Sequence, residues 1–142
     1  MLICMVINTK RWCDPNSPTD GWRILVCRYR PRGLPKKDET WDIWFRQLAP
    51  SRELHAKAYG KVTGIPIVWD KYCLQYFKEM NNKNSQNLIA FLAKVIESGE
   101  NITLLCSSAC TDENHCHRQL LKKMIEDKLS EAHRIKDPER FK

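Results

Sequence analysis

The chain has 142 residues, of which 42% are hydrophobic and 29% charged, a balance typical of a globular domain and not of a disordered or fibrous protein. Its formal net charge of +7 favours an acidic partner, such as nucleic acid, a nucleotide or another phosphorylated small molecule. No apolar run approaches the roughly 18 residues that a membrane span needs, so we expect a cytoplasmic protein with no membrane partner, whose seven cysteines are free thiols or metal ligands.

The first part of the chain predicts two buried strands and a short helix. Residues 2–7 are an apolar run of strand length, residues 22–27 are a second such run that contains one charged residue, Arg23, and a turn-rich loop separates the two. A basic loop over residues 28–37 follows, in which two prolines exclude a regular helix. Residues 39–47 then predict a short helix with its tryptophans on one side.

The middle of the chain predicts three helices in succession. Ser51 can cap a short helix that continues to about Tyr59. Residues 67–80 carry apolar side chains four apart, which indicates a second helix. Ser85 is the expected N-cap of a third, amphipathic helix, which Gly99 ends.

The last part predicts a strand over residues 102–106 and a long helix from about Asp112 to about His133. Apolar strands separated by a helical connection are typical of a small, mostly parallel sheet with helices on both faces. We therefore expect one α/β domain over residues 1–135. The charged tail, residues 136–142, is expected to fray.

A cluster of cysteines and histidines follows the third strand, in the sequence CSSACTDENHCHR. In α/β proteins, the end of a strand before a helix is where ligands bind. Thiolate and imidazole groups suit zinc, although the spacing matches no standard zinc knuckle, and the sequence alone favours no metal. If zinc is a cofactor, its ligands are expected to be Cys106, Cys110, Cys116 and His117.

Two other interpretations of this cluster stay open. In a thiol-dependent enzyme, Cys116 would be the nucleophile, with His117 or His115 as its base and Arg118 holding an anionic substrate. In a purely structural interpretation, Cys106 is a small buried hydrophobic residue. Whether the protein is an enzyme stays undecided at this point.

The basic loop predicts an anion site, because arginine binds phosphate and carboxylate through two parallel hydrogen bonds. In a parallel sheet, this loop and the cysteine-rich loop would leave the sheet at the same edge. We expect a pocket between them for a phosphate-bearing or nucleotide-like ligand. The expected ligand-binding residues are Arg28, Arg32, Asn114, His115, His117 and Arg118, with a helix N-terminus near Asn114 assisting.

Two alternatives accompany this hypothesis. The arginines of the basic loop could instead form ion pairs that only hold the loop in place. The general basic surface could also serve a nucleic-acid-binding module, whose affinity would fall steeply with salt. Most of the aromatic residues are expected to be packing anchors.

Three sequence blocks carry a resemblance to a known family. Lys10–Pro15, Asp20–Val26 and Pro31–Gly33, in this order, resemble the YeaO-like family, domain of unknown function 488. The resemblance extends to about Leu129, implies an α/β fold and brings no established activity. The family's Asp, Leu and Trp in the basic loop are replaced here by Cys27, Tyr29 and Arg30. The resemblance leaves His117, Arg28 and Arg32 as the site residues that do not depend on a cysteine.

Overall fold

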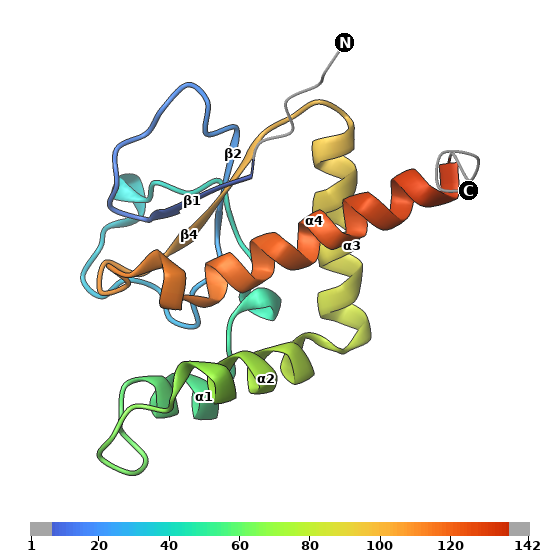
Figure 1. Ribbon diagram of the computed structural model, residues 1–142. Helices are drawn as coiled ribbons and strands as arrows, with labels where there is room; N and C mark the ends of the chain where they lie inside the picture. The colour runs from blue at the N-terminus through green and yellow to red at the C-terminus, as the bar shows by residue number, and fades with distance from the viewer. Residues whose placement is uncertain (1–6, 137–142) are drawn as a thin grey trace.

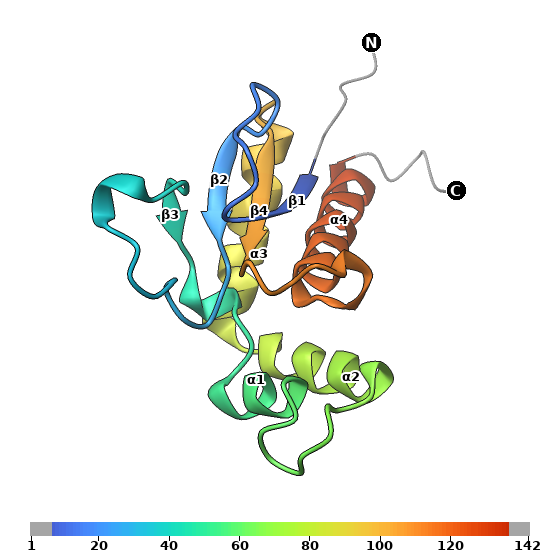
Figure 2. The same cartoon turned by 90° about the vertical axis from the view of Figure 1, so that its left-hand side faces the viewer.

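The computed structural model describes residues 7–136 and contains a parallel, four-stranded sheet. Its strands stand in the order β1-β4-β2-β3, and Figure 2 shows this order from one side of the sheet. All three strand pairs are parallel, so the four strands end at the same edge. The strands are β1 (Ile7–Arg11), β2 (Trp22–Leu25), β3 (Ile43–Trp44) and β4 (Ile102–Cys106).

Four α-helices and three short 3-10 turns complete the described part of the chain. The helices are α1 (Arg52–Ala58), α2 (Trp69–Met80), α3 (Lys83–Glu97) and α4 (His117–Lys136), and the 3-10 turns are Lys36–Asp38, Arg46–Leu48 and Glu113–His115. The prediction of a single α/β domain with a parallel sheet is confirmed. Among the described residues, no helix is long and apolar enough to cross a membrane.

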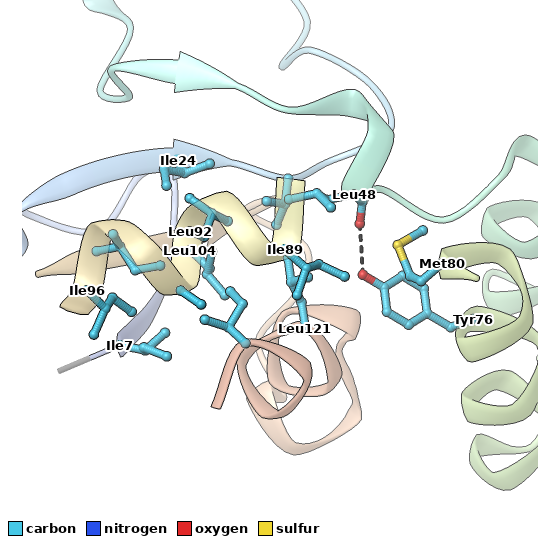
Figure 3. Close-up of a cluster of buried hydrophobic side chains, with 14 of the residues drawn as sticks. Ile7, Ile24, Leu48, Tyr76, Met80, Ile89, Leu92, Ile96, Leu104 and Leu121 are labelled. Carbon is cyan, nitrogen blue, oxygen red and sulfur yellow. Dashed lines mark hydrogen bonds between the residues drawn. The ribbon is translucent and has the colours of Figure 1, made fainter. Parts of the chain in front are cut away.

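The main hydrophobic core lies between one face of the sheet and the crossed helices α3 and α4 (Figure 1). Ile24 and Leu104 are neighbours on this face, and Leu92 of α3 and Leu121 of α4 pack into the same cluster. Figure 3 shows these side chains together with Tyr76 of α2. Burying a side chain of this size contributes about 1.5–3 kcal/mol, so this core is the main source of stability.

The opposite face of the sheet has a second, smaller core. Leu25 and Leu105 are fully buried there, and Trp12, Trp41 and Trp44 pack against them. These tryptophans belong to β3 and to the loops after β1 and before β3, so loops and an edge strand occupy this face where helices were expected. Three large indole rings can exclude water from a four-stranded sheet without a helical layer.

The segment that was predicted as a short helix over residues 39–47 is instead the edge strand β3 and a 3-10 turn. That prediction was wrong because the tryptophan spacing imitates a helical face. This segment pairs with the edge of β2. The Asp42 N–H donates to the Arg23 carbonyl, and the Asp42 carboxylate accepts from the Arg23 N–H. The Trp44 indole N–H also donates to the carbonyl of Cys27.

The first strand also differs from its prediction. β1 begins at Ile7 and continues to Arg11, whereas residues 2–6 lie outside the described residues. The strand is not fully apolar, because it carries Asn8, Thr9, Lys10 and Arg11. Its position at the edge of the sheet allows these polar side chains to be partly exposed.

Two N-cap residues were predicted, and one of them is confirmed. Ser51 caps α1 by accepting a hydrogen bond from the Leu54 N–H at 3.1 Å. Ser85 does not cap α3, because Asn82 holds that position and accepts from the Ser85 N–H at 2.9 Å. Ser85 is buried inside the helix and donates its hydroxyl to the carbonyl of Gln47.

Helices α1 and α2 lie beyond the carboxyl ends of the strands (Figure 2). Tyr76 of α2 is fully buried, and its hydroxyl donates to the carbonyl of Leu48 at 2.8 Å, as Figure 3 shows. Glu79 of the same helix accepts hydrogen bonds from the backbone N–H and the hydroxyl of Ser51. These contacts fix the helix pair next to the strand edge where a ligand site is expected.

Candidate functional site

A cavity of about 550 Å³ opens at the carboxyl edge of β2 and β4. The loop after β2 contributes Cys27, Arg28 and Tyr29, and the loop after β4 contributes Ser107 and residues 109–112. Helices α1 and α2 close the other side. The two predicted loops therefore meet at one pocket, because the parallel strands that carry them end at the same edge.

Two rows of aromatic rings line this cavity. In the first row, Tyr29 contacts His55 of α1 at 5.0 Å between ring centroids, and His55 contacts Tyr59 at 4.7 Å. In the second row, His115 contacts Trp69 of α2 at 5.2 Å. Trp69 in turn stacks on Tyr72 at 5.2 Å with an interplanar angle of 13°. The pocket thus offers flat ring surfaces from four separate segments of the chain.

His55 and Tyr59 of the first aromatic row are uncharged near neutral pH. Burial lowers the pKa of His55, and the nearby Lys61 lowers it further. Burial and the neighbouring Cys110 thiolate raise the pKa of Tyr59 to about 12, so its hydroxyl stays protonated. Arg28, at the edge of the cavity, forms no ion pair with a carboxylate of the described residues. Its positive charge is therefore available to a ligand.

The cysteines and His117 gather at one wall of the cavity. The Sγ atoms of Cys106 and Cys110 are 3.2 Å apart. His117 Nδ1 lies 3.9 Å from Cys106 Sγ and 3.9 Å from Cys116 Sγ. The donor atoms of Cys106, Cys116 and His117 all lie within 4.8 Å of one another. All these cysteines are free thiols in the structure.

The backbone determines which nitrogen of His117 faces the thiols. The imidazole is buried, and its Nε2 lies 2.8 Å from the carbonyl oxygen of Val26. A carbonyl can only accept, so Nε2 carries the proton. Burial lowers the pKa of His117, which keeps the ring neutral. Nδ1 therefore presents an unshared electron pair to Cys106 and Cys116.

The three clustered thiols differ in their affinity for protons. Hydrogen bonds from Cys106 and Cys116 lower the pKa of Cys110. The same hydrogen bonds raise the pKa of Cys106 and Cys116, and burial raises them further. Cys110 is thus the thiol of the group that loses its proton most readily. It is also the least buried of the three, since Cys106 and Cys116 are 3% and 4% exposed.

A buried arginine lies next to this cluster. Arg118 is only 4% exposed, and its Nη2 donates to the carbonyl of Cys110 at 3.3 Å. Its Nε and Nη1 have no hydrogen-bond partner among the described residues. Arg118 also makes no ion pair there with a carboxylate. A buried guanidinium without a paired anion is costly, so negative charge nearby is favoured.

The structure brings some of the predicted site residues together and separates others. Arg28, His115, Cys116 and His117 line the cavity with Cys106 and Cys110. The side chain of Arg32 is exposed and lies outside the cavity lining. Asn114 and Arg118 also do not line it.

The predicted helix N-terminus near Asn114 is wrong. The long helix was expected from about Asp112, but α4 begins at His117, after the 3-10 turn Glu113–His115. The carboxylate of Asp112 accepts from the Asn114 N–H, so it stabilises the turn and not the helix. The site thus has no helix N-terminus at the position where an anion was expected.

The aromatic lining of the cavity was not predicted from the sequence. Tyr29, His55, Tyr59 and Trp69 were not predicted as site residues, because aromatic residues were expected to be packing anchors. One available signal was the spacing of His55 and Tyr59, four residues apart at the end of a predicted helix. Tyr29 is 49% exposed and Tyr59 is 45% exposed, which a core residue would not be.

Comparisons with known proteins identify the family. Residues 7–129 match the family profile described as the Active DUF488-N3 subclade. The "Uncharacterized protein YeaO" of Escherichia coli (strain K12) is 35% identical over 112 residues, covering 78% of this chain and 90% of the relative. The "Uncharacterized protein Rv3073c" of Mycobacterium tuberculosis (strain ATCC 25618 / H37Rv) is 34% identical over 76 residues, covering 54% of this chain and 61% of the relative. No solved structure matches the chain at a significant level. The chain belongs to the YeaO-like family, domain of unknown function 488.

Proposed function

We propose that the protein binds a small ligand that combines a flat ring with a phosphate or carboxylate group, such as a nucleoside monophosphate. The observation that carries this proposal is one cavity of about 550 Å³ lined by two aromatic rows and Arg28. Pockets of roughly 300–1,000 Å³ are typical of small-molecule sites. The position at the carboxyl edge of a parallel sheet supports the same conclusion.

The aromatic rows would hold the ring of the ligand. Tyr29, His55 and Tyr59 form one row, and His115 and Trp69 begin the other. Stacking of a base on an aromatic side chain contributes roughly 1–3 kcal/mol and tolerates any base. This pocket therefore favours planar ligands and discriminates weakly among them.

Arg28 would hold the anionic group of the ligand. It borders the cavity beside Tyr29 and has no competing ion pair among the described residues. A hydrogen bond to a charged group contributes about 1.5–3 kcal/mol. Loss of this arginine should therefore weaken binding of a phosphorylated ligand more than binding of the same ligand without its phosphate.

Isothermal titration calorimetry of the reduced protein tests this proposal with AMP, GMP, CMP and UMP, each paired with its nucleoside. We expect the monophosphates to bind tighter than the nucleosides. Arg28→Gln should weaken monophosphate binding about tenfold, equivalent to about 1.4 kcal/mol, and leave nucleoside binding unchanged. Tyr29→Ala should weaken both, because it removes a stacking surface from the half-exposed rim.

Two matched variants serve as controls. Arg32→Gln removes an exposed arginine of the same loop that does not line the cavity. Phe91→Ala removes an exposed aromatic ring of α3, which also does not line it. Neither variant should change the affinity. Equal losses in Arg28→Gln and Arg32→Gln would instead indicate binding to the general basic surface and would overturn the proposal, as would no binding of any monophosphate.

A further inference from the structure

We propose that Cys106, Cys110, Cys116 and His117 bind one zinc ion at the wall of the cavity. The sequence spacing alone does not favour a metal, but the fold places the donor atoms of Cys106, Cys116 and His117 within 4.8 Å of one another, with Cys110 on the loop beside Cys106. Three thiolates and one imidazole form a common zinc ligand set. Zinc binding at this wall does not depend on the identity of the ligand in the cavity.

The distances among Cys106, Cys116 and His117 are close to those of a tetrahedral site. With Zn–S near 2.3 Å and Zn–N near 2.0–2.1 Å, tetrahedral geometry places two sulfur ligands about 3.8 Å apart and a sulfur and a nitrogen about 3.6 Å apart. His117 Nδ1 is 3.9 Å from both Cys106 Sγ and Cys116 Sγ. Cys110 Sγ is 3.2 Å from Cys106 Sγ but is not among the donors that all lie within 4.8 Å of one another, so the Cys110 side chain must move toward Cys116 and His117 to become the fourth ligand. Cys110 lies on the loop between β4 and the following 3-10 turn, where such a shift requires no change in the sheet.

The imidazole is already oriented as a ligand. Its Nε2–H donates to the Val26 carbonyl at 2.8 Å, and this leaves Nδ1 as the coordinating atom. Metal-binding histidines characteristically donate their other ring N–H to such an acceptor, which fixes the ring and the tautomer. The acceptor here is a backbone atom directly after β2, so the orientation is built into the sheet.

The charge of the site is balanced from outside the ligand set. Three thiolates and one Zn²⁺ together carry one negative charge. Arg118 is buried, has two guanidinium nitrogens without partners among the described residues, and donates to the carbonyl of the ligand Cys110. A zinc–thiolate group adds negative charge beside this arginine, which also interacts electrostatically with the carboxylate of Asp14 but forms no ion pair with it. Binding of the ion would release to solvent the protons that remain on the thiols.

A disulfide is the main competing explanation for the short sulfur–sulfur distance. Cys106 and Cys110 are close enough that oxidation could join them, and this would remove two of the four ligands. A disulfide would not explain why His117 turns its electron pair toward Cys106 and Cys116. The two explanations predict different masses and different numbers of reactive thiols.

Native mass spectrometry of the protein, purified with reductant and loaded with zinc, tests the site directly. We expect one zinc per chain, removed by a strong chelator together with the appearance of free thiols. Substitution of Co²⁺ should give the visible bands of a tetrahedral ion and a near-ultraviolet thiolate-to-cobalt band. An apo mass after zinc loading would overturn the proposal. So would an octahedral cobalt spectrum, or a disulfide mass that persists in reductant.

Single-cysteine variants test the ligand set. Cys110→Ser and Cys116→Ser should each weaken zinc binding more than about 100-fold, because loss of even an outer-shell partner costs about 10–100-fold. Cys13→Ser, which changes an exposed loop thiol, and Cys73→Ser, which changes a thiol on α2, are matched controls that should retain the ion. Retention in Cys110→Ser with loss in Cys27→Ser would overturn the assigned set.

The test also separates this site from the proposed ligand pocket. Circular dichroism of each variant shows whether lost metal binding reflects lost folding, and the Co²⁺ spectrum of the wild-type chain does not depend on any variant. Zinc binding without monophosphate binding would refute only the proposed function. Monophosphate binding to a metal-free protein that cannot be loaded would refute only the zinc site.

Discussion

At the scale of single residues, Asp20 illustrates how one side chain connects several elements. Its carboxylate forms ion pairs with Lys10 of β1 at 2.7 Å and with Arg23 of β2 at 2.5 Å. It also accepts from the Ser17 N–H, while its carbonyl accepts from the Thr103 hydroxyl of β4. Asp20 is buried, so these contacts lie mostly out of water. One residue, in the loop before β2, therefore connects β1, β2 and β4.

Asp20→Asn should lower the free energy of unfolding by about 3 kcal/mol, because removing one partner of a buried ion pair leaves the other charge uncompensated. Urea unfolding at neutral pH measures this loss. Asp38→Asn, which changes an exposed aspartate without an ion pair among the described residues, is the control and should have almost no effect. An equal stability of the two variants would contradict the prediction.

The same aspartate predicts a pH dependence. Burial alone would raise the pKa of Asp20, but hydrogen bonds from Lys10, Ser17 and Arg23 outweigh it and lower the pKa. The unfolded-state pKa is near 3.9. A lowered folded-state pKa means that the stabilisation is fully present above about pH 4 and is lost as the pH falls through the folded-state value. The stability difference between wild type and Asp20→Asn should therefore narrow in acid, which urea unfolding at several pH values would show.

At the scale of elements, α3 shows how local sequence signals compete for a helix start. Asn82 and Ser85 are both good N-cap residues, and they stand three positions apart. The structure assigns the cap to Asn82, because the Ser85 hydroxyl is engaged by the carbonyl of Gln47 in the turn before α1. A tertiary contact thus decides between two equivalent local choices.

Asn82→Ala should lower the free energy of unfolding by about 1 kcal/mol, the usual cost of losing an N-cap side chain. Asn87→Ala is the matched control, because it changes an exposed asparagine inside the same helix. The control should be neutral or slightly stabilising, since alanine has the higher helix propensity. Thermal unfolding followed by circular dichroism compares the two, and an equal effect of both would argue against the assigned cap.

At the scale of the whole molecule, two hydrophobic clusters share one sheet. The larger contains side chains from all four α-helices, and the smaller contains the tryptophans of the opposite face. Neighbouring residues of β2, such as Ile24 and Leu25, belong to different clusters. Neither cluster can lose its packing without exposing the strand that the other covers.

This shared sheet predicts a single unfolding transition. Tryptophan fluorescence reports largely on the smaller cluster, and the far-ultraviolet circular dichroism signal reports on the helices over the larger one. Coincident urea midpoints for the two signals are expected, as for a two-state domain. Separate midpoints would mean that one face unfolds independently of the other.

Most of the fold could be predicted from hydrophobic periodicity. The strand over residues 102–106 and the helices near residues 51–59 and 67–80 were recognised because each buries one continuous apolar pattern. β3 could not be recognised, because two residues carry no periodicity and their state depends on the edge of β2. The start of α4 was placed too early, because a 3-10 turn precedes it.

The site was also only partly predictable, because some of its contacts depend on how distant elements pack. Two loops that follow parallel strands must share an edge, so the meeting of Arg28 and His117 at one cavity could be inferred. Arg32 stands four residues after Arg28, and no sequence pattern shows that its side chain lies outside the cavity that Arg28 lines. The aromatic rows depend on how α1 and α2 dock, which spacing along a chain does not encode.

The hydrogen bond from His117 to the Val26 carbonyl has a consequence for how this protein can change by mutation. Every residue has a carbonyl, so substitution of Val26 leaves the acceptor in place as long as the strand path is kept. The direction in which the imidazole points is therefore inherited with the backbone. Neighbouring side chains can therefore be substituted one at a time without changing the orientation of this ring. The ligand specificity of the pocket can change in this way while His117 stays in place.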